Sequence, residues 1–176
     1  DKGLNTGGMG TIAPNPYYTN DIAAECMEKI FIPTMNAMNA EGRKFKGCLY
    51  FGLMLTPNGP KVIEYNCRFG DPETQVVLPL LKSDLLNIML AVANESLDAS
   101  MVEFSNESAC CVVMASNGYP QKYNTGFEIT IEDGVDAQVY IAGAKNGENG
   151  SILTAGGRVL GVTAVADTLA NAVSKA

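Results

Sequence analysis

Hydrophobic and polar positions change their period along the chain, and these changes predict a series of different elements. From residue 20 to about residue 40, apolar side chains recur at a spacing near 3.6 residues behind a polar capping residue, which predicts a helix. Pro33 falls inside this helix. Because proline lacks a backbone donor and clashes with the preceding turn, we expect a kink or two abutting helices there.

Alternating apolar positions then predict a β-hairpin. Residues 47–56 and 61–67 are expected to form its two strands, joined by the turn sequence PNGP. Helical spacing returns over residues 73–81 and 83–94, and Ser83 is the expected N-terminal cap of the second helix. Both helices are expected to pack against the rest of the protein, and their side chains are not expected to take part in catalysis.

From residue 109 onward the pattern changes to short strands separated by Gly, Asn and Asp turns. The strand segments are ACCVVMA, GFEITI, AQVYIA, SILTA and RVLGVTAVA. AGAKNGENG reads as an exposed hairpin loop, and Asp167 is expected to cap a marginal last helix. We therefore predict an α+β fold in which residues 1–104, an antiparallel sheet with helices, precede a small β-rich C-terminal domain of residues 105–176.

Composition and charge narrow the range of partners. The 176 residues carry a formal net charge of −7 with no cluster of Lys or Arg, which argues against nucleic acid or an anionic membrane as a partner. No apolar run reaches the roughly 18 residues of a membrane span, and no basic, apolar leader precedes a cleavage site. We therefore expect a soluble, cytoplasmic protein whose small anionic substrates need a local site.

The five cysteines and the absence of histidine limit the chemistry of this chain. An odd number of cysteines without CxxC spacing indicates neither a disulfide framework nor a zinc site, so reduced core thiols are expected. Without histidine, the chain cannot supply a Ser-His or Cys-His nucleophile or a histidine general base. Its chemistry must depend on carboxylates, a metal ion, Arg, Lys and backbone groups.

The candidate chemistry is concentrated in residues 60–75, PKVIEYNCRFGDPETQ. Side chains alternate between the faces of a strand, so Glu64 and Asn66 are expected on one face, about 7 Å apart, where their oxygens suit a hard cation such as Mg²⁺. Arg68 follows on that face, where its guanidinium would bind a carboxylate or phosphate bidentately. The three side chains could equally form a solvent-facing polar stripe.

The turn after this strand carries Asp71 and Glu73, which add acidic groups to the same region. Both are also compatible with an ordinary turn, because Asp-Pro is common in turns.

Two glycine-rich stretches are candidate anion sites. NTGGMG, residues 5–10, can present consecutive backbone N–H groups, although it would also serve as a tight connection between a strand and a helix. In TAGGRVLGV, Gly156 and Gly157 allow sharp turning, and Arg158 would either bind phosphate or form a surface salt bridge.

These motifs carry a family resemblance. Glu-x-Asn-x-Arg at the end of a strand resembles the metal and phosphate strand of the ATP-grasp ligases, and RFGDPETQ closely resembles the motif of the phosphoribosylamine–glycine ligases, or glycinamide ribonucleotide synthetases. The likeness extends from NTGGMG to GGRVLGVTA, although the family's usual loop has Pro where Leu4 stands. Residues 1–104 would then be the C-terminal portion of an ATP-grasp catalytic domain.

The resemblance implies an ATP-dependent carbon–nitrogen ligase of purine biosynthesis. The family joins glycine to 5-phosphoribosylamine through a glycyl phosphate and gives glycinamide ribonucleotide, ADP and phosphate. It uses ATP as a cosubstrate with Mg²⁺ or Mn²⁺. This reaction suits a chain without histidine, because phosphoryl transfer depends mainly on positioning and charge neutralisation.

The resemblance also implies a role for each candidate residue. Glu64 and Asn66 would hold the metal ion, and Arg68 would stabilise the transferring phosphoryl group or the glycine carboxylate. Asp71 and Glu73 would orient Arg68 or hold the glycine ammonium. The substrate-facing loop would comprise Asn5, Thr6, Gly7, Gly8 and Gly10.

Some of the family's parts are expected to lie elsewhere. Its adenine pocket, ATP lid and N-terminal domain precede the NTGGMG loop, so we expect the remainder of the same polypeptide to be a partner and this segment alone to be inactive. ATP-grasp enzymes often place another metal-ligating carboxylate on the neighbouring strand, but residues 49–55 contain none. A second ligand would come from water, nucleotide phosphate or residues outside this chain.

Two alternative functions remain at this point. Another ATP-grasp carboxylate–amine ligase would share Glu-x-Asn-x-Arg but would not be expected to carry RFGDPETQ. A non-catalytic interaction module would show no effect of nucleotide or Mg²⁺ on the full-length chain.

Overall fold

The chain forms two compact units, each assembled from segments that are distant in the sequence. The structure is a computed structural model that describes residues 2–176. Unit 1 comprises the described residues up to Ala13 together with Asp71–Leu80 and Ser105–Ala176. Unit 2 comprises Pro14–Gly70 and Leu81–Phe104.

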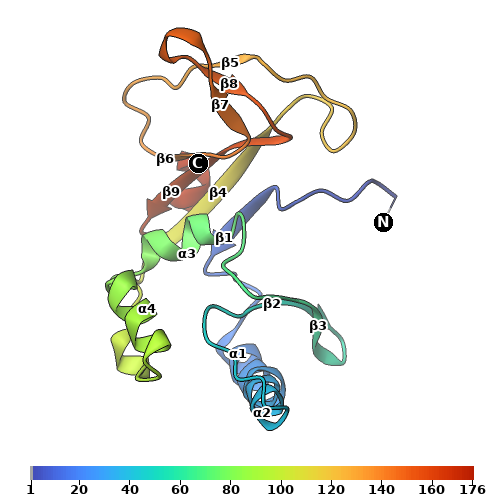
Figure 1. The fold of residues 1–176 in the computed structure, drawn as a ribbon, viewed down its shortest axis with the longest axis vertical. Helices are drawn as coiled ribbons and strands as arrows, with labels where there is room; N and C mark the ends of the chain where they lie inside the picture. Colours follow the sequence, from blue (N-terminus) through green and yellow to red (C-terminus); the bar gives the residue numbers. More distant parts are fainter. Residues whose placement is uncertain (1) are drawn as a thin grey trace. The chain divides into compact units, whose positions relative to one another are not determined.

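Unit 1 is built on a four-stranded antiparallel sheet in the order β1-β4-β9-β6 (Figure 1). Its strands are β1 (Gly10–Ala13), β4 (Ser108–Ala115), β9 (Arg158–Ala166) and β6 (Gln138–Ile141). The long pair β4 and β9 forms the centre, and its nearly continuous apolar sequence suits a strand that is covered on both faces. The short strand β1, from the start of the chain, was not predicted.

A helix covers each face of this sheet. Alternation along β4 separates two buried clusters, because neighbouring side chains point to opposite faces. One cluster joins Ala109 and Cys111 to Val76 and Leu80 of α3 (Thr74–Leu80), and the other joins Cys110 and Ala166 to Ala172 of α5 (Leu169–Lys175). Packing therefore stabilises α5, which is too short to form by propensity alone.

The cap of α5 differs from the prediction by one residue. Thr168 is the cap, and its side-chain oxygen accepts a hydrogen bond from Asn171 N at 3.2 Å. Asp167 instead accepts from the side-chain nitrogen of Asn171 at 2.8 Å. The extended residue directly before the first helical residue is the one whose side chain can reach back to the first turn.

A second, three-stranded antiparallel sheet in unit 1 has the order β5-β8-β7. Its strands are β5 (Glu128–Ile129), β8 (Ile152–Thr154) and β7 (Ala144–Asn146). The prediction of a hairpin here is confirmed, but AGAKNGENG is not all loop, because β7 lies inside it. The turn is the short 3₁₀ helix η3 (Glu148–Gly150).

Unit 2 contains the predicted hairpin, made of β2 (Tyr50–Thr56) and β3 (Gly59–Asn66). Gly59 lies at the turn with φ +82°, a conformation that glycine adopts without strain. An aromatic contact joins the hairpin to the helical segment before it, since the ring centroids of Phe31 and Phe51 lie 4.4 Å apart. Within the hairpin, the rings of Phe51 and Tyr65 lie 5.3 Å apart.

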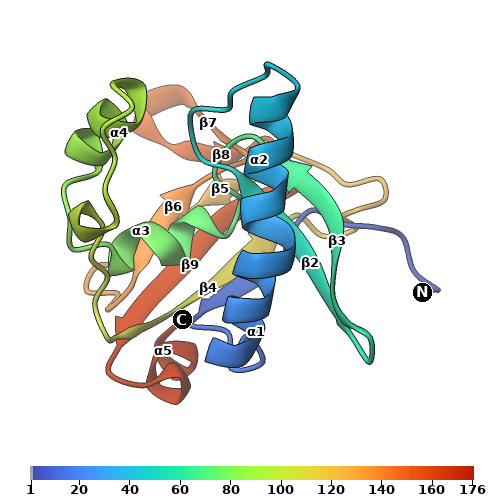
Figure 2. The ribbon, with the colours of Figure 1, turned by 90° about the horizontal axis from the view of Figure 1, so that it is seen from below.

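The helical segment before the hairpin consists of three consecutive parts and runs past Pro33 (Figure 2). These parts are α1 (Asn20–Cys26), the π-helical turn η1 (Met27–Phe31) and α2 (Ile32–Ala40). Pro33 stands at the start of α2, as expected for two abutting helices. The wider π-helical turn before it relieves the clash that proline makes with the preceding turn.

The remaining part of unit 2 contains α4 (Leu85–Ala93) and the short 3₁₀ helix η2 (Ala99–Met101). Asp84, not the predicted Ser83, caps α4. Ser83 Oγ instead accepts a hydrogen bond from Glu103 N at 2.7 Å. No helix within residues 2–176 is long and apolar enough to cross a bilayer.

The five cysteines are free thiols. Cys26, Cys110 and Cys111 are buried, Cys48 is half-buried and Cys67 is exposed. The prediction of core thiols is therefore right for the three buried residues and wrong for Cys67, which follows the end of β3.

Candidate functional site

Glu64 and Asn66 lie on one face of β3, as the alternation predicted. The side-chain nitrogen of Asn66 donates a hydrogen bond to Glu64 Oε1 at 3.1 Å. The pairing of the hairpin shifts register between Gly52 and Leu53, so that Ile63 is an extra residue on β3. Because this irregularity comes before Glu64, the alternation between Glu64 and Asn66 is preserved.

Gly52 on β2 makes room for the Glu64 side chain. The two residues are paired across the hairpin, and a Cβ added to Gly52 would lie 2.8 Å from Glu64 Cγ. The Glu64 side chain therefore lies over the bare backbone of β2. Sequence reasoning did not single out Gly52, although a glycine inside a strand often marks such a close approach.

This pair of side chains fits a hard cation. Glu64 is exposed and Asn66 is half-buried, and each brings an oxygen that Mg²⁺ or Mn²⁺ accepts as a ligand. Rotating the Asn66 amide by half a turn would present its oxygen in place of its nitrogen. Within residues 2–176 no group of three or more His, Cys, Asp or Glu could hold a metal, but Mg²⁺ needs only one or two protein oxygens.

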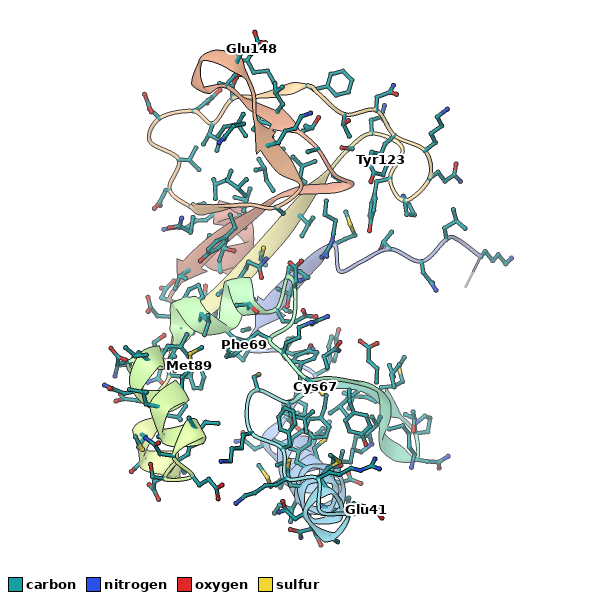
Figure 3. All side chains as sticks on the ribbon, in the orientation of Figure 1. Glu41, Cys67, Phe69, Met89, Tyr123 and Glu148 are labelled. Carbon is teal, nitrogen blue, oxygen red and sulfur yellow. The ribbon has the colours of Figure 1, made fainter. Side chains whose placement is uncertain are left out.

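Arg68 stands on the segment that follows β3. Its sequence neighbours Cys67 and Phe69 are labelled in Figure 3. The Arg68 side chain is exposed, and its Nη1 donates a hydrogen bond to the backbone oxygen of Phe69 at 3.0 Å. This local bond leaves the guanidinium at the surface of unit 2.

Asp71 belongs to unit 1, where its carboxylate is held from two sides. Its Oδ2 forms an ion pair with Arg158 Nη2 at 2.9 Å, and its Oδ1 accepts a hydrogen bond from Gln75 Nε2 at 2.9 Å. The salt-bridge interpretation of Arg158 is therefore confirmed. Glu73 is half-buried at the start of α3, where its backbone oxygen accepts from Val77 N at 3.0 Å.

The NTGGMG loop leads into β1 and is tied to distant parts of unit 1. Tyr119 Oη accepts a hydrogen bond from Gly7 N at 2.9 Å, and Arg158 Nη1 donates to Gly8 O at 3.1 Å. Asn5 and Thr6 are exposed, and Gly10 is the first residue of β1. The loop is thus more than a connection, because side chains far along the chain hold its backbone.

Close packing explains why this loop contains glycines. A Cβ on Gly8 would lie 2.4 Å from Pro72 Cδ, and a Cβ on Gly7 would lie 2.8 Å from Arg158 Nε. A larger residue at position 8 would therefore push the loop away from Pro72, and one at position 7 would displace the Arg158 side chain.

A cavity of about 420 Å³ lies in unit 1 beside these contacts. Its polar walls include Asp71, Gln75, Tyr119 and Arg158. The side-chain oxygen of Gln75 is buried and has no hydrogen-bond partner among the described residues. Sequence reasoning missed Gln75 and Tyr119 as parts of the site, since only the fold brings residue 119 next to residue 7.

Comparison with known families places the protein in the ATP-grasp class, and the matched region contains the hairpin. The family model described as "Phosphoribosylglycinamide synthetase, ATP-grasp (A) domain" matches residues 1–74. The model for the C domain of the same synthetase matches residues 109–176. The chain therefore belongs to the phosphoribosylglycinamide synthetase family, and the predicted resemblance is confirmed.

Individual relatives agree with this assignment. The chain is 50% identical to a phosphoribosylamine–glycine ligase of Caldanaerobacter subterraneus subsp. tengcongensis, over 96% of this chain and 40% of the relative. It is also 50% identical to the bifunctional purine biosynthetic protein PUR2,5 of Pichia angusta, over 100% of this chain and 23% of the relative. The chain thus spans at most about two fifths of these relatives.

A solved structure supports the fold. The crystal structure of a phosphoribosylamine–glycine ligase from Thermotoga maritima superposes with a TM-score of 0.84 at 34% identity, and covers 99% of this chain and 43% of that chain. The predicted α+β class, with antiparallel sheets and helices, is confirmed.

Proposed function

We propose that this chain is part of an ATP-dependent ligase that joins glycine to 5-phosphoribosylamine and gives glycinamide ribonucleotide, ADP and phosphate. The observation that carries the proposal is the Glu64–Asn66 pair on β3, inside the region that matches the ATP-grasp domain of the synthetase family. The remainder of the same polypeptide would supply the rest of the nucleotide site. We place this activity in the cytoplasm, within purine biosynthesis.

Glu64 and Asn66 would hold Mg²⁺ or Mn²⁺ beside the ATP phosphates. When bound, the ion would offset the negative charge of those phosphates. The two side chains suit this role because both carry oxygens and both lie on the same face of one strand.

Arg68 would bind the glycine carboxylate or the transferring phosphoryl group, since a guanidinium presents two parallel donors to an oxygen pair. A carboxylate oxygen of glycine would attack the γ-phosphorus of ATP and release ADP. The amine of phosphoribosylamine would then attack the acyl carbon of the glycyl phosphate and release phosphate. Such transfers depend on alignment and charge stabilisation more than on a general base.

Asp71 and Glu73 would hold the glycine ammonium or orient Arg68. The contacts of Asp71 with Arg158 and Gln75 support a fixed carboxylate at this position. The substrate loop would comprise Asn5, Thr6, Gly7, Gly8 and Gly10. We also propose that residues 1–104 are the ATP-grasp portion and residues 105–176 the C-terminal domain.

The proposal can be tested with the purified full-length polypeptide. ADP release should require both glycine and freshly generated phosphoribosylamine, and isotope-labelled glycine should appear in a product with the mass of glycinamide ribonucleotide. ADP release with a different carboxylate and amine would favour another ATP-grasp ligase. A full-length protein whose melting temperature does not respond to ATP and Mg²⁺ would favour a non-catalytic interaction module.

A further inference from the structure

Tyr119 links the NTGGMG loop to the C-terminal hairpin of unit 1. Its hydroxyl oxygen accepts the hydrogen bond from Gly7 N at 2.9 Å, although 112 residues separate the two in the sequence. Both residues are half-buried, so solvent competes less with this bond than at an open surface. The bond occupies the backbone N–H of Gly7, in a loop that continues into β1 at Gly10.

Gly157 fixes the position of the Tyr119 ring. A Cβ on Gly157 would lie 2.2 Å from Tyr119 Cδ2, so the ring lies directly on the glycine backbone. The backbone N–H of Ser116, three residues before Tyr119, donates to Gly157 O at 2.7 Å. The Tyr119 ring therefore packs against the backbone of Gly157 while its hydroxyl accepts the hydrogen bond from Gly7.

A second side chain fixes the next residue of the loop. Arg158, which follows Gly157, donates from Nη1 to Gly8 O at 3.1 Å and pairs with Asp71 through Nη2. The backbone N–H of Gly7 and the backbone oxygen of Gly8 are thus bound by two side chains, those of Tyr119 and Arg158. Tyr119 and Arg158 also line the same cavity.

We infer that Tyr119 is a positioning residue for the substrate loop: its hydroxyl holds Gly7 N–H so that residues 5–8 keep the conformation that contacts substrate. This inference rests on the proposed function. Tyr119 does not need to touch the reacting atoms, because it acts through Gly7. The loss of one hydroxyl should therefore change substrate affinity more than the rate of the chemical step.

The test is Tyr119→Phe in the full-length polypeptide, since this substitution removes the hydroxyl and keeps the ring on Gly157. Tyr123→Phe is the matched control, because Tyr123 is also half-buried, its ring lies 6.1 Å from that of Tyr119, and it stands on the same connection between β4 and β5 (Figure 3). Steady-state KM values for glycine, phosphoribosylamine and ATP are measured separately, together with kcat.

We expect Tyr119→Phe to raise the KM for glycine or phosphoribosylamine about fivefold, as the loss of one hydrogen bond predicts, with the KM for ATP unchanged. Tyr123→Phe should leave all three values unchanged. Equal effects of the two substitutions, or equal changes in all three KM values for Tyr119→Phe, would overturn the inference. If Tyr119 only stabilised the fold, its substitution would not raise the KM for glycine or phosphoribosylamine while leaving the KM for ATP unchanged.

A second readout does not depend on activity. In the full-length polypeptide, amide hydrogen exchange at Gly7 should become several-fold faster in Tyr119→Phe and stay unchanged in Tyr123→Phe. Unaltered exchange at Gly7 would overturn the contact itself. If the wild-type full-length protein does not turn over, the proposed function fails, and the exchange experiment still decides whether Tyr119 holds the loop.

Discussion

Arg158 and Asp71 form an ion pair of 2.9 Å across 87 residues of sequence. The same guanidinium donates from Nη1 to Asp71 O at 2.9 Å and to Gly8 O at 3.1 Å. One side chain therefore joins the acidic turn, the glycine loop and the start of β9. The arrangement makes Arg158 a cross-link of unit 1 as well as a charged wall of its cavity.

Arg158→Gln should lower the free energy of unfolding of the 176-residue chain by about 1 kcal/mol. The substitution removes three hydrogen bonds, but the Asp71 side chain is 54% exposed, so solvent screening reduces the contribution of the ion pair. Urea unfolding followed by far-ultraviolet circular dichroism measures the change. Lys175→Gln is the control, because its pair with Asp136 at 2.8 Å is more exposed and should contribute less to the free energy of unfolding. Equal losses in the two variants would show that Arg158 is an ordinary surface residue.

Glu64→Gln in the full-length polypeptide should shift the Mg²⁺ activation curve to higher concentration and leave the melting temperature nearly unchanged. The carboxamide keeps the shape of the side chain but loses the charge that a hard cation requires. Activity is measured as ADP release over a Mg²⁺ titration. An unaltered curve would contradict the metal assignment.

Gly52→Ala gives an independent test of the same site without changing any charge. The added methyl would meet Glu64 Cγ at 2.8 Å, so the Glu64 side chain must move. We expect a weaker Mg²⁺ response, in the same direction as for Glu64→Gln. Glu28→Gln, at an exposed acid on the helical segment of unit 2, should leave the titration unchanged.

Local sequence predicted the hairpin and the common face of Glu64 and Asn66 because the relevant signals are local. Strand alternation and the PNGP turn define β2 and β3, and the register irregularity at Ile63 falls before Glu64, so it does not separate Glu64 from Asn66. The caps of α4 and α5 were each misplaced by one residue. Several polar residues compete at those boundaries, and only the backbone conformation decides which side chain reaches the first turn.

The contacts of unit 1 could not be predicted from sequence in the same way. β1 is four residues long and pairs with β4, about 100 residues later, so no neighbouring pattern marks it as a strand. The bond between Gly7 and Tyr119 and the bond between Gly8 and Arg158 are likewise products of the fold. The glycine loop was recognised from its composition, whereas the side chains that hold it were not.

Arg68→Lys in the full-length polypeptide should lower kcat about a hundredfold with little change in stability. Lysine keeps the charge but loses the planar pair of donors, and losing one charge-stabilising contact of this kind costs roughly 3 kcal/mol of barrier. The fold should tolerate the change, because Arg68 is exposed and its hydrogen bond goes to the adjacent Phe69. Turnover at the wild-type rate would show that Arg68 takes no part in the reaction.

The last prediction concerns acid stability and the Glu95 carboxylate. The hydrogen bond from Lys44, followed by the one from Lys46, lowers the pKa of Glu95 from its ordinary 4.5 to about 2. Lys46 Nζ lies 2.7 Å from Glu95 Oε1. Glu95 keeps this contact although its φ of +57° lies in the left-handed region that favours glycine.

The sign of the pH effect follows from this shift. Because the pKa is lower in the folded state, the Glu95 carboxylate stabilises the fold above pH 4.5, and this contribution is lost as the pH falls from 4.5 to about 2. Glu95→Gln should therefore make the decline of unfolding free energy shallower within that window, as measured by urea unfolding at a series of pH values. Glu41→Gln, at an exposed acid of the same unit, should keep the wild-type slope. If Glu95→Gln also keeps that slope, the two lysines do not stabilise the carboxylate in solution, and the contact contributes nothing to acid stability.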